Sequence, residues 1–202
     1  MKQRQLEILL QKIPEPETPV PELEQYMTPA SIAADILFRA YQWGDIEHKT
    51  VVDLGCGTGI FSVGAIYMGA VNVFGFDIDK KVIAIAKKYA RTNALPIIYS
   101  LKDVSMVNTT CDTVLMNPPF GAQKSNNKAD RKFLEKAFEI SSVIYSLHLK
   151  KTFVFLEKMI KALGGDITHH KAYTFPIKWM FDFHTKQIVN YDVILLRITT
   201  HH

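Results

Sequence analysis

The sequence predicts an α/β fold with a mostly parallel sheet, helices on both faces of the sheet, and an antiparallel hairpin at the carboxyl-terminal end. After residue 50, short continuous apolar runs alternate with longer amphipathic segments, which is typical of βαβ units whose sheet is buried on both faces. After Gly164, two strand-like segments follow one another without a helical stripe between them, and this order predicts the hairpin. A length of 202 residues is that of one domain.

The composition excludes several classes of protein. With 48% hydrophobic and 22% charged residues, the chain is neither intrinsically disordered nor fibrous. Its apolar runs are too short to cross a bilayer and it opens with no signal-peptide pattern, so a cytoplasmic protein without membrane contact is expected. Cys56 and Cys111 lack CxxC spacing and nearby histidines, so no metal site is predicted. A formal net charge of +4 favours an anionic partner such as RNA only weakly.

Two helices are predicted before the alternating pattern begins. Apolar residues at helical spacing indicate the first, and a stretch with four prolines at 14–21 ends it. A broad apolar stripe over 29–43 indicates the second, with Thr28 as its N-cap and Gly44 as its end. The predicted parts of the single domain 1–202 are a helical extension over the ligand site, 1–45, and a catalytic core, 46–202.

The core contains seven strand candidates, with helical stripes between several of the first six and none between the last two. Each candidate is a short, mainly apolar run between turn-forming residues. Helical stripes begin at Val82, Phe133 and Phe155, and residues 121–130, rich in Lys, Asn, Ser and Gly, are predicted to form a flexible insert. The predicted strands are 51–54, 71–77, 97–101, 113–117, 142–147, 169–175 and 190–198.

A glycine-rich turn joins the first strand to the following helix. The run from Asp53 to Gly59 reads Asp-Leu-Gly-Cys-Gly-Thr-Gly, and its glycines let a ligand lie against bare backbone. Dinucleotide sites have G-x-G-x-x-G spacing, whereas this turn has G-x-G-x-G. The carboxylate of Asp53 would repel a pyrophosphate but suits a ligand with ammonium and sulfonium groups, so S-adenosylmethionine is favoured over NAD. A purely structural turn is the third alternative.

Acidic residues follow the next two strands. Asp77 ends the second strand about 20 residues after the glycines, where a carboxylate can accept from both ribose hydroxyls. Asp79 has the position of a helix N-cap. Asp103 follows the third strand at the same edge of the sheet, where it could accept from the exocyclic amine of adenine or serve only in a turn.

The sequence Asn117-Pro-Pro-Phe120 lies at the end of the fourth strand. Its prolines fix the backbone, so that the side-chain oxygen of Asn117 and the carbonyl oxygen of Pro118 could converge on one NH2 group. Accepting from both hydrogens of a nucleobase amine favours the tetrahedral, nucleophilic form of its nitrogen. The ring of Phe120 offers a face on which an extruded base could stack. The pattern predicts amino methylation without a strong general base, with an ordinary loop as the alternative.

With these motifs, the chain resembles the class I, Rossmann-like S-adenosylmethionine-dependent methyltransferases that methylate amino groups. It resembles most closely the methyltransferase-like protein five family and its archaeal relatives, which are small-subunit ribosomal RNA adenine-N6 methyltransferases. The resemblance runs from Leu23 onward, although Met27 replaces a proline that many members have. The motifs that carry it are Leu-Glu-Gln-Tyr26 with Thr28, the run from Asp53 to Gly59, Gly75-Phe-Asp77-Ile-Asp79, Asp103-Val104, Met116-Asn-Pro-Pro-Phe-Gly121, Tyr145-Ser-Leu-His148 and Phe183-His184.

The resemblance implies a role for each matching residue. It also implies a partner, a small zinc-binding methyltransferase activator protein that covers apolar surface and extends the sheet. The residues expected to take the target base and carry the reaction are Asn117, Pro118, Pro119 and Phe120. The residues expected to bind S-adenosylmethionine are Gln25, Tyr26, Thr28, Asp53, Gly55, Gly57, Thr58, Gly59, Ile60, Asp77, Ile78, Asp103, Val104 and Asn117.

Other polar residues lie near the acceptor motif or follow a strand. Lys124, Lys128, Arg131 and Lys132 are interpreted as contacts to RNA phosphates, with ordinary solvated side chains as the alternative. His148 follows a strand and is predicted either to face the active site or to be a buried, hydrogen-bonded histidine.

Three functions are compatible with these motifs. The first is N6 methylation of an adenosine, with ribosomal RNA or the small ribosomal subunit as substrate. The second keeps the fold and the cofactor but methylates a protein glutamine or a DNA base. Relatives of that kind often carry Asn-Pro-Pro-Tyr, so Phe120 favours the first function. The third is a non-catalytic RNA-binding scaffold, which predicts degraded cofactor and acceptor motifs, and the sequence shows no such degradation.

Overall fold

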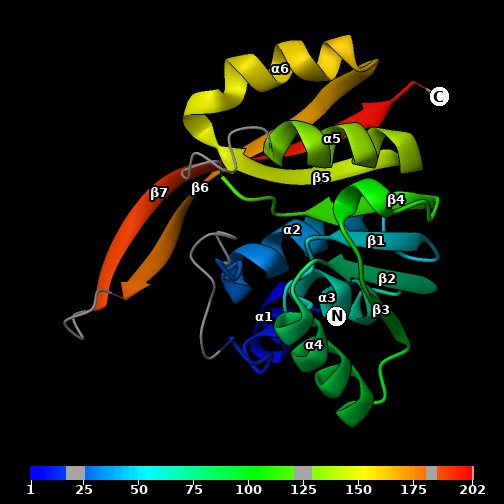
Figure 1. The fold of residues 1–202 in the computed structure, drawn as a ribbon, viewed down its shortest axis with the longest axis vertical. Coiled ribbons are helices and arrows are strands. Elements are labelled where there is room, and N and C mark those ends of the chain that lie inside the picture. Colours follow the sequence, from blue (N-terminus) through cyan, green and yellow to red (C-terminus); the bar gives the residue numbers. More distant parts are fainter. Residues whose placement is uncertain (17–25, 121–128, 181–185, 202) are drawn as a thin grey trace.

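The computed structural model describes residues 1–16, 26–120, 129–180 and 186–201. Its strands are β1 (Thr50–Leu54), β2 (Asn72–Asp77), β3 (Ile97–Leu101), β4 (Cys111–Met116), β5 (Ser141–Leu149), β6 (Gly165–Met180) and β7 (Lys186–Thr200). They form one sheet in the order β3-β2-β1-β4-β5-β7-β6, in which β1 to β5 run parallel and β7 is antiparallel to both its neighbours (Figure 1). The predicted fold class is confirmed.

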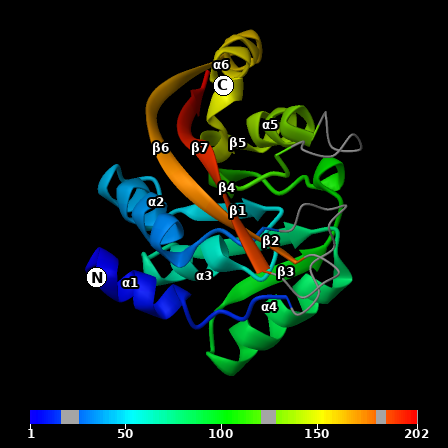
Figure 2. The same ribbon diagram turned by 90° about the vertical axis from the view of Figure 1, so that its left-hand side faces the viewer.

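Helices cover both faces of the sheet (Figure 2). Buried side chains of α1, α2 and α3 form a core on one face, and those of α5 and α6 form a core on the other. Leu6 and Leu10 of α1 are completely buried, so the first helix contributes to the hydrophobic core. The α-helices are α1 (Gln3–Leu10), α2 (Ala30–Gln42), α3 (Ile60–Tyr67), α4 (Lys80–Thr92), α5 (Ala129–Ile140) and α6 (Phe153–Ala162); short 3₁₀ turns are η2 (Val104–Met106) and η4 (Lys150–Thr152).

The terminal hairpin is longer than the sequence predicts. The expected strands, 169–175 and 190–198, are the inner parts of β6 and β7, whose backbone pairing continues out to Met180 and Lys186. Figure 1 shows this outer part of the hairpin extending beyond the rest of the sheet. Apolar residues alternate with Thr174, Pro176 and Lys178 through this part of β6, but Pro176 makes the run look interrupted in the sequence, although an edge strand such as β6 tolerates a proline.

The start of α2 also differs from the prediction. Pro29 holds the N-cap position, and its carbonyl oxygen accepts from the N–H of Ala33. The prediction of Thr28 as N-cap is wrong, because its hydroxyl oxygen instead accepts from the side chain of Asn117. Gly44, with a φ of 76°, ends the helix as predicted.

A buried ion pair joins the end of α2 to the antiparallel part of the sheet. Arg197 on β7 donates through Nε and Nη2 to the two carboxylate oxygens of Asp45, at 2.8 and 3.1 Å. Tyr145 on β5 donates to the same carboxylate, and Thr113 on β4 donates to the backbone carbonyl of Asp45. The hydrogen bond to Asp45 raises the pKa of Arg197. These contacts fix the connection between α2 and β1 on the sheet.

Candidate active site

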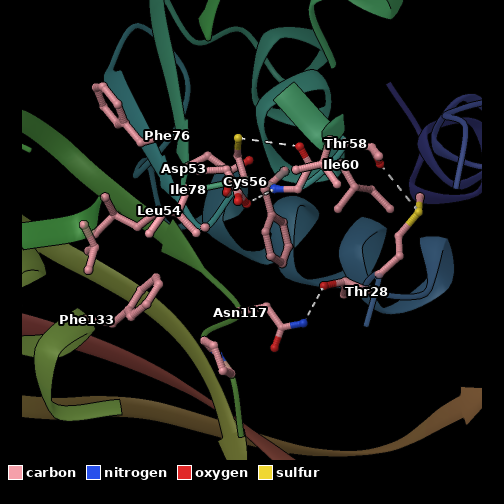
Figure 3. Close-up of a pocket in the computed structure, with 18 of the residues that line it drawn as sticks. Thr28, Asp53, Leu54, Cys56, Thr58, Ile60, Phe76, Ile78, Asn117 and Phe133 are labelled. Atoms are coloured by element: carbon pink, nitrogen blue, oxygen red, sulfur yellow. Dashed lines mark hydrogen bonds between the residues drawn. The ribbon is translucent and has the colours of Figure 1, made fainter. Parts of the chain in front are cut away.

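A pocket of about 410 Å³ lies where the parallel strands end (Figure 3). Its walls come from the turns after β1, β2, β3 and β4, from the segment before α2, and from the start of α5. This volume is in the range of sites for small molecules and cofactors. The carboxyl edge of parallel strands is also the usual place for ligands in α/β folds.

The glycine-rich turn after β1 is fixed to the neighbouring strand. Gly55 and the next residue donate their N–H groups to one carbonyl oxygen of β2, at 2.9 and 3.0 Å. The N–H of Gly57 donates to Oδ2 of Asp77 at 2.8 Å. Gly59 has a φ of 94°, and a Cβ there would collide with the hydroxyl of Tyr99, so a larger residue does not fit. Gly55 and Gly57 thus present backbone to the pocket.

Asp53 ends β1 beneath this turn and is only 1% exposed. Its Oδ2 accepts from the backbone N–H and the Oγ of Ser62, at 2.9 and 2.6 Å, in the first turn of α3. Burial raises the pKa of Asp53 to about 7, against the opposing effect of the hydrogen bonds from Ser62. A cation bound in the pocket would favour the carboxylate form.

Asp77 is held at the end of β2 by two backbone donors. Its Oδ2 accepts from Gly57 at 2.8 Å, and its Oδ1 accepts from the N–H of Asp79 at 2.9 Å. Burial raises the pKa of Asp77. Asp79 itself caps α4 by accepting from the N–H of Lys81, as predicted. The ribose contact of Asp77 stays a prediction.

Asp103 pairs with a lysine from the start of α5. Nζ of Lys132 lies 2.8 Å from Oδ1 and 2.9 Å from Oδ2 of Asp103, and Ser105 donates to Oδ1 through its N–H and its Oγ. The bond from Lys132 is the main cause that lowers the pKa of Asp103 to about 2. Asp103 therefore stabilises the turn after β3, which is one of the two roles that the sequence predicted, and it also lines the pocket.

The side chain of Asn117 at the end of β4 is bonded on one edge only. Nδ2 donates to Oγ1 of Thr28 at 3.0 Å and to the carbonyl oxygen of Tyr26 at 3.5 Å. Oδ1 is buried and accepts from no donor in the described part of the chain. Figure 3 shows this oxygen on the edge of the amide that faces away from Thr28. A buried acceptor without a partner is rare and calls for a functional reason.

The acceptor motif departs from the prediction at its aromatic residue. The Phe120 ring is 8% exposed and packs edge-on against Phe175 of β6, with ring centroids 5.7 Å apart. Asn117 and Pro119 line the pocket, whereas Pro118 and Phe120 do not. The expected open stacking face on Phe120 is therefore absent from this structure, because the ring completes the core beneath the hairpin.

Most of the residues expected to bind the cofactor come together at the pocket. Gly59, the N-cap of α3, is the described exception, and Gln25 lies outside the described residues. Those that line the pocket are Tyr26, Thr28, Asp53, Gly55, Gly57, Thr58, Ile60, Asp77, Ile78, Asp103, Val104 and Asn117.

The expected phosphate contacts are arranged differently. Lys132 lines the pocket and pairs with Asp103, so the structure does not hold it ready for a phosphate. Arg131 is exposed and pairs with Glu135 one turn along α5. Lys124 and Lys128 lie outside the described residues.

Sequence reasoning missed several residues that line the pocket, among them Met27, Phe76 and Phe133. Phe133 lies so close to Gly55 that a Cβ there would be 3.1 Å from its ring. A signal for it was available, because the helix that follows the acceptor motif must begin near the carboxyl edge of the sheet.

Outside the pocket, His148 is completely buried, and its Nε2 lies 2.7 Å from Oγ of Ser146. The structure thus supports the reading of a buried, hydrogen-bonded histidine. Among the described residues, no three potential ligand side chains gather where they could hold a metal ion. In that same part of the chain, no helix combines the length and apolar character needed to cross a membrane.

Comparisons with known proteins agree with this geometry. Residues 32–141 match the model of the methyltransferase small domain family. The chain is 35% identical to rRNA N(6)-adenosine-methyltransferase METTL5 of Danio rerio, over 98% of this chain and 99% of that protein. It is 33% identical to the Drosophila melanogaster enzyme of that name, over 99% and 98%. A crystal structure from Pyrococcus horikoshii, described provisionally as an RNA methyltransferase, superposes with a TM-score of 0.92 at 38% identity, over 100% of this chain and 99% of that chain.

Fold, pocket and family model together define a methyltransferase of the small-domain class with a Rossmann-like fold. The chain belongs to the METTL5 family, because relatives of that name match it over nearly its whole length. The family that the sequence motifs indicated is thereby confirmed.

Proposed function

We propose that the protein transfers a methyl group from S-adenosylmethionine to the N6 amine of an adenosine in ribosomal RNA. The names of the METTL5 relatives support this reaction and this substrate class. Within the molecule, the observation that carries the proposal is the buried Oδ1 of Asn117, which has no donor among the described residues. Leaving a buried acceptor unsatisfied costs about 1–3 kcal/mol, and the amine of a bound adenine would supply the missing hydrogen.

S-adenosylmethionine fits the donor set of the pocket. Asp53 gains its charge readily beside a cation, which suits the ammonium and sulfonium groups of this cofactor. Asp77 would accept from the ribose hydroxyls, and Asp103 from the adenine amine. Ile78 and Val104 line the pocket as apolar walls for the adenine ring. When bound, the cofactor supplies a methyl group activated by the positive sulfur.

Asn117 is the residue that would hold the reacting amine. Its Oδ1 accepts one N6 hydrogen, and the carbonyl oxygen of Pro118 is the proposed second acceptor. These two bonds favour the tetrahedral nitrogen and orient its lone pair for in-line displacement, in which the N–C bond forms as the S–C bond breaks. The methylated nitrogen carries a positive charge and loses its proton to solvent, so no strong general base is needed.

The target base has to leave its stack and open the acceptor motif. Oδ1 of Asn117 is inaccessible to solvent, and the ring of Phe120 is buried against Phe175. Stacking of the base on Phe120 would therefore require that ring to turn out of the core as the base binds. An extruded or single-stranded adenosine is the form that fits this requirement.

Partner and location belong to the same proposal. The family resemblance implies a small zinc-binding activator protein, and β3 offers an edge strand for a partner that extends the sheet. Ile98, Leu101 and Met106, on or just after this strand, are more than half exposed, at 58%, 52% and 68%. A ribosomal RNA substrate supports action in the cytoplasm.

The substrate class is tested by incubating the protein with methyl-labelled S-adenosylmethionine and separate fractions of ribosomal RNA, DNA and protein. Digestion of each fraction then identifies the methylated product. We expect the label in N6-methyladenosine from ribosomal RNA. Label in glutamine or in DNA would contradict the proposed substrate, and cofactor binding without any transfer, even with the activator protein added, would support a scaffold.

A further inference from the structure

The amide of Asn117 has one orientation because of the segment that precedes α2. Nδ2 donates to Oγ1 of Thr28 at 3.0 Å and to the backbone carbonyl of Tyr26 at 3.5 Å. A backbone carbonyl oxygen can only accept, so this edge of the amide carries the NH2 group. Oδ1 is thereby placed on the opposite edge.

We propose that Thr28 is a positioning residue for methyl transfer, whose hydroxyl oxygen acts together with the carbonyl oxygen of Tyr26 to hold the Asn117 amide so that an acceptor meets the substrate amine. This inference rests on the proposed function and adds a residue 89 positions away in the chain. Thr28 is only 3% exposed, so water does not readily replace its hydroxyl as the acceptor.

The reversed amide would be unproductive. A side-chain amide has nearly the same shape after its oxygen and nitrogen exchange places, so its hydrogen-bond partners decide the orientation. With the amide reversed, NH2 would face an adenine amine whose hydrogens are also donors. The substrate would then lose the hydrogen bond that favours its nucleophilic form, although the base would still fit.

The same segment also contacts the glycine-rich turn. Oγ1 of Thr58 donates to Sδ of Met27 at 3.7 Å (Figure 3). Residues 26–28 therefore contact both the turn proposed to bind the cofactor and the motif proposed to bind the amine. This one segment therefore positions the glycine-rich turn and the acceptor motif relative to each other.

Thr28→Val removes the acceptor with little change of shape, and Thr28→Ser keeps it. We expect Thr28→Val to lower kcat for transfer to ribosomal RNA by about 10- to 100-fold. The KM for RNA should change by less than about threefold, and any rise in the Kd for S-adenosylmethionine should be smaller than the loss in kcat, because Thr28 also lines the cofactor pocket. Thr28→Ser should recover kcat to within about threefold. Thr113→Val is the matched control, because it makes the same change at a buried threonine that bonds Asp45, and it should leave kcat unchanged.

Unchanged kcat in Thr28→Val, or no recovery in Thr28→Ser, would overturn the positioning role. A loss confined to cofactor affinity would also overturn it, since Thr28 would then act on the cofactor alone. A wild-type protein that binds S-adenosylmethionine but methylates no adenosine would contradict the proposed function instead. In that case, the side-chain amide NMR signals of Asn117 still test the role of Thr28. We expect them to shift in Thr28→Val but not in Thr28→Ser, and unshifted signals in Thr28→Val would overturn the positioning role.

Discussion

Burial and the proposed ligand have opposite effects on the pKa of Asp53. Burial raises the pKa of this carboxyl from 3.8 to about 7, whereas a bound cation would lower it. Below about pH 7, cofactor binding should therefore release a proton from Asp53, and the affinity should fall as the pH falls.

Asp53→Asn tests this competition. The folded protein keeps the Asp53 proton up to about pH 7, while the unfolded chain releases it near pH 3.8, so the wild-type protein loses stability as the pH rises between these values. The variant keeps an acceptor for Ser62 but cannot ionise. In thermal denaturation, the melting temperature of the variant should rise relative to that of the wild type from pH 5 to pH 8. Its affinity for S-adenosylmethionine should fall about tenfold at pH 8 and should depend less on pH than the wild-type affinity does. A melting-temperature difference that is the same at every pH would contradict this account.

Single residues show which features of the site the sequence could predict and which it could not. Asp53, Asp77 and Asn117 line one pocket, as their positions at the ends of recognisable strands predict, and their contacts to cofactor and substrate stay predictions. The partners of Thr28 and Lys132 were not predicted, since these hydrogen bonds join residues 89 and 29 positions apart. No local pattern encodes a contact between side chains on separate elements.

At the scale of elements, the terminal hairpin supports the acceptor motif. Phe175 of β6 is completely buried and contacts the ring of Phe120. Phe175→Ala should lower the free energy of unfolding by about 3 kcal/mol or more through the cavity that it leaves beside Phe120. Phe175→Leu, which keeps most of the volume, should retain more than half of this stability. A loss below about 1 kcal/mol for Phe175→Ala, measured by chemical denaturation, would show that the hairpin does not support the motif.

The Asp45–Arg197 ion pair is a second contact between elements for which we predict the effect of a substitution on stability. Arg197→Met would leave a buried carboxylate unpaired, and we expect a loss of about 3–5 kcal/mol in the free energy of unfolding. Arg39→Met is the matched control, because Asp35 keeps its bonds to Lys171 and Tyr173, and its cost should be below about 1 kcal/mol. Equal losses for the two variants in urea denaturation would contradict the structural role of the buried pair.

The elements themselves were predicted unevenly. Strand 97–101 is matched residue for residue and the other parallel strands nearly so, because each is a short, mainly apolar run bounded by turn-forming residues. The outer halves of β6 and β7 were missed, because Pro176 interrupts the alternating run in the sequence, whereas the pairing in the structure continues past it. The Thr28 cap was wrong because a side chain from another element took its hydroxyl.

At the scale of the whole molecule, the parallel sheet gathers the site. β1, β2, β3 and β4 end at one edge, so the residues that follow them meet in one pocket, and the order of motifs along the chain was enough to predict this. The docking of the segment before α2 was not predictable, because no strand precedes it to fix the end of the sheet that it approaches.

The role of the buried Oδ1 of Asn117 in methyl transfer is tested by single-turnover kinetics. The rate of transfer to ribosomal RNA is measured for the wild-type protein and for Asn117→Ala, and cofactor affinity is measured in parallel. Asn72→Ala, at an exposed asparagine that bonds Thr50, is the control. We expect Asn117→Ala to lose a factor of about 100 or more in rate, with a rise in its Kd for S-adenosylmethionine that is much smaller than the loss in rate, while the control keeps the wild-type rate. An Asn117→Ala enzyme that forms N6-methyladenosine at the wild-type rate would contradict the role of the buried oxygen.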